Sequence, residues 1–158
     1  MPSTLSLPAA PSPRPVPVAP PDPLAEAREL LRRAARLPYH AARADAWARR
    51  FRRLTADATA AITRHVLHLQ RGQPAEPGAE TPPRLLPALR RQAEEAQDLA
   101  RASFDLAHEA AAAHRPDIWN MVELGEQAMR LSIAVERHHN RLLEISYEAG
   151  QRDLGGGG

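Results

Sequence analysis

The apolar side chains recur at a helical spacing over three long stretches of the chain. Between residues 117 and 149 they stand alternately three and four positions apart, which is typical of the seam of a coiled-coil-like bundle. The members of this seam are Met121, Leu124, Ala128, Leu131, Val135, His138, Leu142, Ile145 and Ala149. The pattern predicts an amphipathic helix that buries this face, with one histidine in it.

The stretch from residue 84 to residue 114 repeats the pattern with smaller side chains. Its seam consists of Leu89, Ala93, Ala96, Ala100, Ser103, Ala107 and Ala110. Because the distance between two packed helices depends on the side chains at their contact, an alanine seam lets the backbones approach closely. In a third stretch, residues 39–70, the apolar stripe begins with Tyr39, Trp47 and Phe51, so we expect the aromatic part of the core at that end.

Proline, glycine and capping residues mark where the predicted helices begin and end. Asp22 followed by Pro23 is a favourable helix start, because aspartate accepts hydrogen bonds from free backbone N–H groups and proline suits the first helical position. A short helix over residues 23–37 follows from this. Thr81 is the predicted N-cap of the alanine-rich helix, and Gly150 is the predicted C-cap of the last helix.

Proline is concentrated at the start of the chain, where nine of the 16 prolines fall within the first 23 residues. The composition of residues 1–22 therefore predicts a disordered, extended arm. Such an arm serves either as a spacer or as a ligand for an aromatic groove. Residues 151–158, which end in four glycines, predict a flexible tail. Between them, residues 23–150 predict an all-α fold: an elongated bundle of three to four helices, one short and three long.

The predicted bundle has few large apolar side chains for its length. Residues 24–150 contain 31 Leu, Ile, Val, Met, Phe, Trp and Tyr residues among 127. Burial contributes about 25 cal/mol per Å² of apolar surface, whereas ordering costs about 1–2 kcal/mol per residue. We therefore expect that a second copy, or another helical protein, supplies further burial.

The charge is unevenly distributed along the chain. All 21 basic residues are arginine, which fits either a biased nucleotide composition or a use of the planar, bidentate guanidinium group. Residues 24–71 hold 11 Arg and 4 acids, a net charge of +7, whereas residues 84–150 hold 8 Arg and 11 acids, a net charge of −3. Such asymmetry predicts either that the two halves attract each other or that one of them faces a charged partner.

Arginines gather on one face of the helix predicted over residues 39–70 and on the short helix before it. The group comprises Arg32, Arg33, Arg36, Arg43, Arg49, Arg50, Arg52 and Arg53. As a basic ridge, it would follow the phosphate backbone of a nucleic acid. The other interpretation is a solvated helix face, partly neutralised by pairs four residues apart, Asp45 with Arg49 and Arg53 with Asp57.

No set of side chains predicts catalysis, a metal centre or a cofactor site. Glu136 and His139, like Asp105 and His108, have the spacing of ligands in carboxylate metal bundles, but both acids project away from the apolar seams and such ligands must point inward. The serines inside the helices lack the glycine-flanked turn of a nucleophile, and there is no glycine-rich phosphate loop. We therefore predict a non-enzymatic protein without metal, cofactor or small-molecule substrate.

His138 interrupts an otherwise apolar seam. A buried imidazole stays neutral or needs a partner, because burial disfavours its charged form. One interpretation is a histidine that fixes the register of the helices through a hydrogen bond across the bundle. The other is a pH-sensitive interface that protonation loosens.

These patterns lead to one functional hypothesis and one alternative. The hypothesis is a helical interaction or scaffold protein that self-associates through its alanine- and leucine-rich seams; the residues expected to carry the contact are Ala96, Ala100, Ala107, Leu131, Val135, His138 and Leu142. The alternative is a small nucleic-acid-binding accessory protein that uses the arginine ridge. The lack of cysteine, of a signal-peptide pattern and of an apolar run of about 18 residues predicts a cytoplasmic protein without membrane association.

Overall fold

The computed structural model describes residues 22–71 and 85–153, and within these ranges the chain forms α-helices, one short 3-10 helix and no strand. The elements are α1 (Pro23–Ala35), η1 (Ala41–Arg43), α2 (Ala44–Arg71), α3 (Leu86–Ala112) and α4 (Ile118–Asp153). α1 has 13 residues, whereas α2, α3 and α4 have 28, 27 and 36. The prediction of an all-α fold with one short and three long helices is confirmed.

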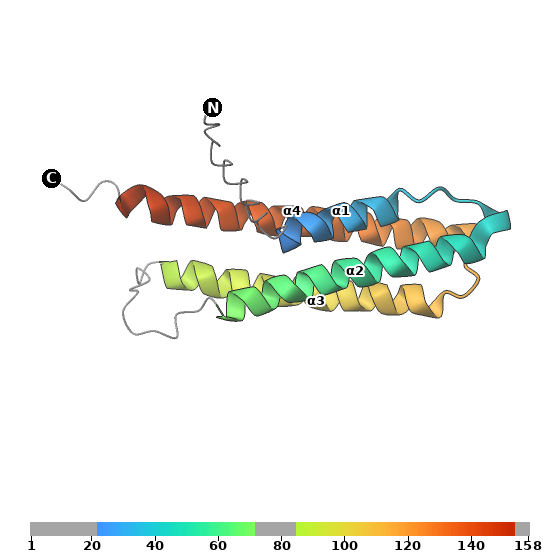
Figure 1. The fold of residues 1–158 in the computed structure, drawn as a ribbon, viewed down its shortest axis with the longest axis horizontal. Helices are drawn as coiled ribbons and strands as arrows, with labels where there is room; N and C mark the ends of the chain where they lie inside the picture. Colours follow the sequence, from blue (N-terminus) through green and yellow to red (C-terminus); the bar gives the residue numbers. More distant parts are fainter. Residues whose placement is uncertain (1–21, 72–84, 154–158) are drawn as a thin grey trace, which may run out of the picture.

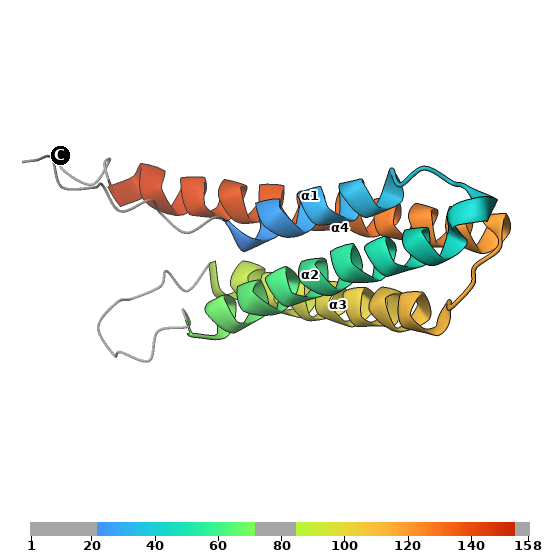
Figure 2. The same ribbon diagram turned by 45° about the vertical axis from the view of Figure 1, so that its right-hand side comes forward.

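The four α-helices run alternately up and down the bundle, as Figure 1 and Figure 2 show. α1 packs on α2 and α4, and α3 packs on the same two helices from the other side. In Figure 1, α1 and α2 lie in front of α4 and α3, so one face of the bundle is formed by the first pair and the opposite face by the second. The C-terminal part of α4 extends beyond the start of α1. This is the topology of an up-and-down four-helix bundle.

The start of α1 follows from local chemistry. The Asp22 side chain accepts a hydrogen bond from the backbone N–H of Leu24 at 3.0 Å, and Pro23 occupies the first helical position. Both features were predicted, and both leave fewer unpaired N–H groups at the first turn. Leu24, Ala27 and Leu31 then lie on one face of α1 and are buried, as the helical period requires.

Two predicted helix ends are wrong. α4 continues through Gly150 to Asp153, so Gly150 is not a C-cap, and no glycine in the described ranges has a positive φ. A glycine inside a helix costs only about 1 kcal/mol, and the glutamine and arginine that follow it favour the helix. α2 begins at Ala44 and not at Tyr39, because the chain runs extended through His40 before it enters η1.

The first helix ends at Ala35 and the third at Ala112, each two residues before its predicted end. Several other predicted features lie wholly or partly outside the described residues. Thr81 lies outside them, and α3 begins at Leu86 with Leu85 in the N-cap position. Residues 1–21 of the predicted arm and 154–158 of the predicted tail also lie outside them, whereas residues 151–153, predicted as part of the tail, belong to α4.

The aromatic part of the core lies at the N-terminal end of α2, as predicted. Trp47 and Phe51 are buried and stack with ring centroids 4.7 Å apart, and the Tyr39 ring lies 6.3 Å from that of Trp47. A Cβ atom at Gly125 of α4 would lie 2.5 Å from the Tyr39 hydroxyl oxygen. Because Gly125 has no side chain, the Tyr39 side chain has room to pack against α4 at this position.

The small residues of α3 allow α2 and α3 to approach closely. The hydroxyl oxygen of Thr59 in α2 lies 3.1 Å from the backbone oxygen of Ser103 in α3, as well as 2.9 Å from the oxygen of Thr55 in its own helix. A side chain this short reaches a neighbouring backbone only where the two helices are close. Ala96 and Ala110, on the same face as Ser103, are buried.

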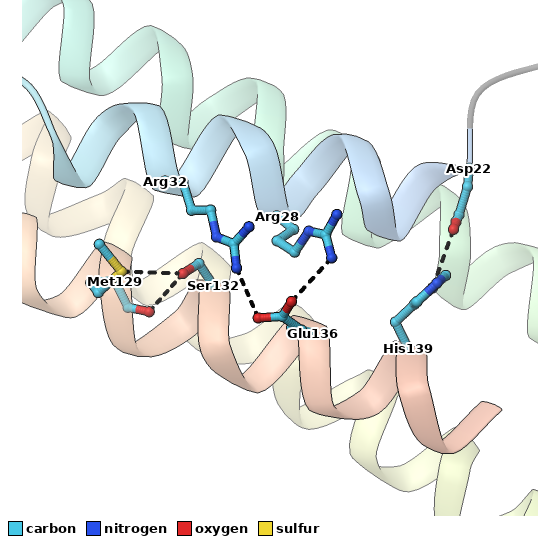
Figure 3. A network of polar contacts seen from close by, with 7 residues as sticks. All are labelled: Asp22, Arg28, Arg32, Met129, Ser132, Glu136 and His139. Carbon is cyan, nitrogen blue, oxygen red and sulfur yellow. Dashed lines mark hydrogen bonds and ion pairs between the residues drawn. The ribbon is translucent and has the colours of Figure 1, made fainter. Parts of the chain in front are cut away.

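A strip of polar contacts fixes α1 along α4 (Figure 3). Arg28 and Arg32 donate to the two carboxylate oxygens of Glu136, at 3.2 and 2.9 Å. At the start of α1, the second carboxylate oxygen of Asp22 lies 3.2 Å from Nδ1 of His139. The basic first half and the acidic second half of the chain thus attract each other at this contact, which was one of the two interpretations of the charge asymmetry.

Candidate functional site

A groove runs along the bundle between α3 and α4, where these neighbouring helices pack less closely than the others. It encloses about 610 Å³. Its floor is apolar and consists of Leu99, Ala102, Leu106, Leu131 and Ala134. The two alanines keep the groove open, since a larger side chain at either position would project into it.

The two walls of the groove carry opposite charges. The α3 wall carries the acids Glu95, Asp98 and Asp105, and the α4 wall carries Arg130, Arg137 and Arg141. Glu95 and Arg141 pair across the groove at 2.5 Å. Asp98 pairs with Arg101 and Arg130 with Glu126, each within its own helix, whereas no ion pair involves Asp105 or Arg137 in the part of the chain that the structure describes. Apart from Glu95 and Arg141, the acids of the α3 wall and the arginines of the α4 wall therefore do not pair with each other across the groove.

The groove continues towards the turn between α3 and α4. Gln127 donates to Glu109 across it at 2.8 Å, and beyond this contact lies a second hollow of about 530 Å³, which Glu123 also lines. Trp119 stands four residues before Glu123, on the same side of α4, and its side chain is 77% exposed. Trp119 itself lines neither of the two hollows.

At its other end the groove is lined by His138, which pairs with a second histidine across the centre of the bundle. Nε2 of His138 lies 3.2 Å from Nε2 of His65 in the diagonal helix α2, and the ring planes are nearly perpendicular. Nδ1 of His138 lies 3.5 Å from a carboxylate oxygen of Glu95. If the N–H on Nδ1 faces this carboxylate, Nε2 of the neutral ring is an acceptor, and the His65 N–H donates to it.

The histidine pair confirms the interpretation of His138 as a core histidine hydrogen-bonded across the bundle. Its partner, His65, was not predicted. The signal was present, because His65 also lies on the apolar stripe of its own helix, between Ile62 and Leu69.

Burial keeps both histidines neutral at neutral pH. The pKa of His65 is lowered to about 4, first by burial and then by the neighbouring His138. Burial also lowers the pKa of His138, although its hydrogen bond to Glu95 and the charge of that carboxylate act in the opposite direction. The other charged groups that act on the pair are Asp22, His68, His139 and Arg141.

The structure separates the eight arginines of the predicted ridge into two groups. Arg32 is bound to Glu136, and Arg52 folds back to donate from Nε to the backbone oxygen of Ala48 at 3.3 Å, so neither is free. The side chains of Arg33, Arg49, Arg50 and Arg53 line one hollow of about 600 Å³ between α1 and α2. Arg36 and Arg43 are also exposed, and Arg43 lines an adjoining hollow together with Arg49.

The ion pairs that were predicted to neutralise this face are not formed. Asp45 pairs with Arg115 at 3.4 Å, not with Arg49. Within the described ranges, Arg53 and Asp57 do not pair either. A pair four residues apart contributes only about 0.2–0.5 kcal/mol, so a tertiary contact such as that of Arg115 readily displaces it.

The seven seam residues predicted to carry self-association lie inside the single chain. Ala96, Leu131, Val135 and His138 are buried, and the other three, Ala100, Ala107 and Leu142, are partly buried. They pack on the helices of their own bundle. Two of them, Leu131 and His138, also line the α3–α4 groove.

The side chains considered as metal ligands do not converge. Glu136 faces α1 and Asp105 stands on the rim of the groove, so both project away from the seams, as predicted. No group of three His, Asp or Glu residues in the described ranges is placed to hold a metal ion. The two Nε2 atoms of His65 and His138 point at each other, because the ring centroids are 5.3 Å apart and the nitrogens 3.2 Å; that arrangement suits a hydrogen bond.

Comparisons with family models, curated proteins and solved structures found no match for this chain. The class of the protein therefore follows from the fold alone, which is an up-and-down four-helix bundle. Among the helices described, none combines the length and the apolar character that a membrane-spanning segment needs.

Proposed function

We propose that this chain is a non-enzymatic interaction protein that self-associates through the groove between α3 and α4. The occupant of the groove is the same surface of a second copy. The observation that carries this proposal is the pair of oppositely charged walls beside an apolar floor.

Charge selects the way in which two grooves meet. Contacts between identical subunits are usually two-fold symmetric. If the two-fold axis runs along the groove, α3 of each copy faces α4 of its partner, and the acidic wall meets the basic wall. If the axis crosses the groove, α3 faces α3 and acids meet acids, which costs free energy. The charges thus favour the first arrangement.

The register of this contact follows from pairs within one chain. Glu95 stands opposite Arg141, and Glu109 stands opposite Gln127, so Asp98 lies level with Arg137. Rotation about an axis along the groove keeps each residue at its level. Asp98 of one copy therefore faces Arg137 of the other, and Ala102 faces Ala134, where small side chains permit close packing.

The size of the groove sets the expected strength of association. From Glu95 to Ala113 the helix rise gives a length of about 27 Å, and two helices side by side are about 20 Å wide. Such a footprint buries roughly 1,000 Å² over both copies, the lower end for specific contacts. We expect a reversible equilibrium between one and two chains.

Two charge reversals test the contact. Arg137→Glu places acids on both walls, and Asp98→Arg places bases on both, so each variant alone should self-associate at least tenfold more weakly than wild type. An equal mixture of the two should associate, because each wall then meets its opposite. Sedimentation velocity over a wide concentration range measures all three. Arg90→Glu, at an exposed position of α3 that does not line the groove, is the matched control and should behave as wild type.

Several results would contradict the proposal. These are a wild-type mass of one chain at every concentration, unchanged association in both reversed variants, or a mixture that stays as weak as its components. If the chain stays monomeric and a different helical protein binds in the groove, the occupant is that protein and not a second copy.

A further inference from the structure

We infer that the face formed by α1 and α2 binds the phosphate backbone of double-stranded nucleic acid through Arg33, Arg49, Arg50 and Arg53. This inference does not rest on the proposed self-association, because the two surfaces lie on different pairs of helices.

These four arginines line the same hollow, and they outnumber the acids in it. They line a single hollow in which Asp57 is the one acid, which leaves a charge of +3. Within the described residues none of the four forms an ion pair. By contrast, Arg28 and Arg32 share Glu136, and Arg64 lies 2.6 Å from Glu26. Ion pairs thus neutralise Arg28, Arg32 and Arg64, whereas the four arginines that line the hollow are free for an external anion.

The spacing of the free arginines suits a repeated anion. Arg49 and Arg53 stand one helical turn apart on α2, with Arg50 beside them, and Arg33 joins them from α1. Arg43, at the end of η1, lines an adjoining hollow together with Arg49, and at the helical rise the row from Arg43 to Arg53 covers about 15 Å. Along one strand of duplex DNA the charges are about 3.4 Å apart, so the row spans about four nucleotides.

The lack of large apolar side chains on this face separates duplex nucleic acid from other anionic partners. Of the large apolar side chains exposed on the described helices, α1 carries none and α2 carries only Leu67, about 21 Å beyond Arg53 along the helix. Insertion into a lipid bilayer requires an apolar face, and binding of single strands uses aromatic rings that stack on bases. The exposed large side chains that line the hollow are arginines, and positive charge is sufficient for contacts with a duplex backbone.

The salt dependence of binding to a duplex of random sequence tests the inference. Each phosphate neutralised contributes about −0.9 to the slope of log affinity against log salt. Wild type should therefore give a slope near −3.6 for four contacts. In the triple variant Arg33→Gln, Arg49→Gln, Arg53→Gln the slope should be shallower by about 2.7. Fluorescence anisotropy of a labelled duplex, titrated at several salt concentrations, measures both slopes.

A matched triple variant separates this site from general basicity. Arg71→Gln, Arg90→Gln, Arg91→Gln removes the same charge from exposed positions outside the hollow, and should change the slope by less than half as much. Replacing Arg33, Arg49 and Arg53 by lysine should keep the slope, because the slope counts charges, and should weaken the affinity through loss of the bidentate geometry. Circular dichroism of each variant checks that the helices remain.

The inference is overturned if wild type does not bind the duplex, or if the two triple variants lose the same slope. It is also overturned if single strands of equal length, vesicles with anionic lipid or polyglutamate bind more tightly than the duplex at the same salt concentration.

Discussion

In the core, His65 and His138 occupy positions that apolar side chains fill elsewhere along the same stripes. The two rings share one hydrogen bond, so one ring nitrogen of each is paired although both side chains are buried. His68, one turn after His65, is exposed. The same residue type thus serves a structural purpose at one position and faces solvent three residues later, because the direction of the side chain differs.

Acid should destabilise the folded chain between pH 6.5 and pH 4. The folded-state pKa of His65 is about 4, against an ordinary value of 6.5, so in this window the unfolded chain binds a proton that the folded chain does not. The contribution is complete above pH 6.5 and is lost as the pH falls, by up to about 3 kcal/mol. Urea unfolding at pH 7 and pH 4 measures it.

The variant His65→Gln isolates this effect, because the amide N–H₂ still donates to His138 but does not titrate. Its free energy of unfolding should depend less on pH than that of wild type. His108→Gln, at an exposed position of α3, should keep the wild-type dependence. Equal pH dependence in wild type and His65→Gln would show that the pair does not govern acid stability.

Among the elements, α1 depends most on its neighbours. It has 13 residues, and isolated helices of that length are marginal in water. Its apolar face packs on α2 and α4, and the contacts of Figure 3 fix its position along α4. Local opening of the bundle is therefore expected to begin with α1.

Removing the charge of Glu136 should loosen α1 without unfolding the bundle. In Glu136→Gln both Arg28 and Arg32 lose a carboxylate partner. Since these side chains are about a third exposed, the cost is nearer to that of a surface network, about 1 kcal/mol. Amide hydrogen exchange should become faster in α1 than in α2 or α3. Glu126→Gln, which breaks an exposed pair within α4, should leave exchange in α1 unchanged, and the same result for Glu136→Gln would contradict the role given to the strip.

At the scale of the whole molecule, the two proposed surfaces lie on opposite faces of the bundle. The groove belongs to α3 and α4, and the arginine hollow belongs to α1 and α2 (Figure 1). Two chains joined through their grooves therefore present their arginines on the two outer sides of the pair. The basic first half of the sequence forms α1 and α2, and the mildly acidic second half forms α3 and α4. The difference in charge along the sequence is therefore also a difference between the two faces of the bundle.

If both proposals hold, the associated protein should bridge two duplexes. Energy transfer between duplexes with donor and acceptor labels should appear when wild type is added at a concentration above the dissociation constant of its self-association. Arg137→Glu, which leaves the arginine hollow intact, should bind duplex but not bring two together, and addition of Asp98→Arg chains should restore the transfer. Bridging by Arg137→Glu alone would show that the groove is not the joining surface.

Much of the fold could be predicted from the spacing of apolar residues. The seam that contains Leu131, Val135 and His138 is buried as expected, because a three-four spacing leaves a helix only one face to bury. The predicted end of α4 at Gly150 was wrong, because a single glycine is a weak stop signal when helix-forming residues surround it. The arginines were predicted as a group, but not which of them are free, since that depends on the place of Glu136 and Arg115 in the fold.

By itself, the sequence determined that the chain is helical, where most helices begin, which faces are apolar and where arginine is concentrated. These properties depend on neighbours within a few turns of one helix. Only the tertiary structure decided that His65 meets His138, that Asp45 turns to Arg115, and that the walls of the α3–α4 groove differ in charge. Each of these contacts joins residues of different helices, and their alignment is set by the packing of the whole bundle.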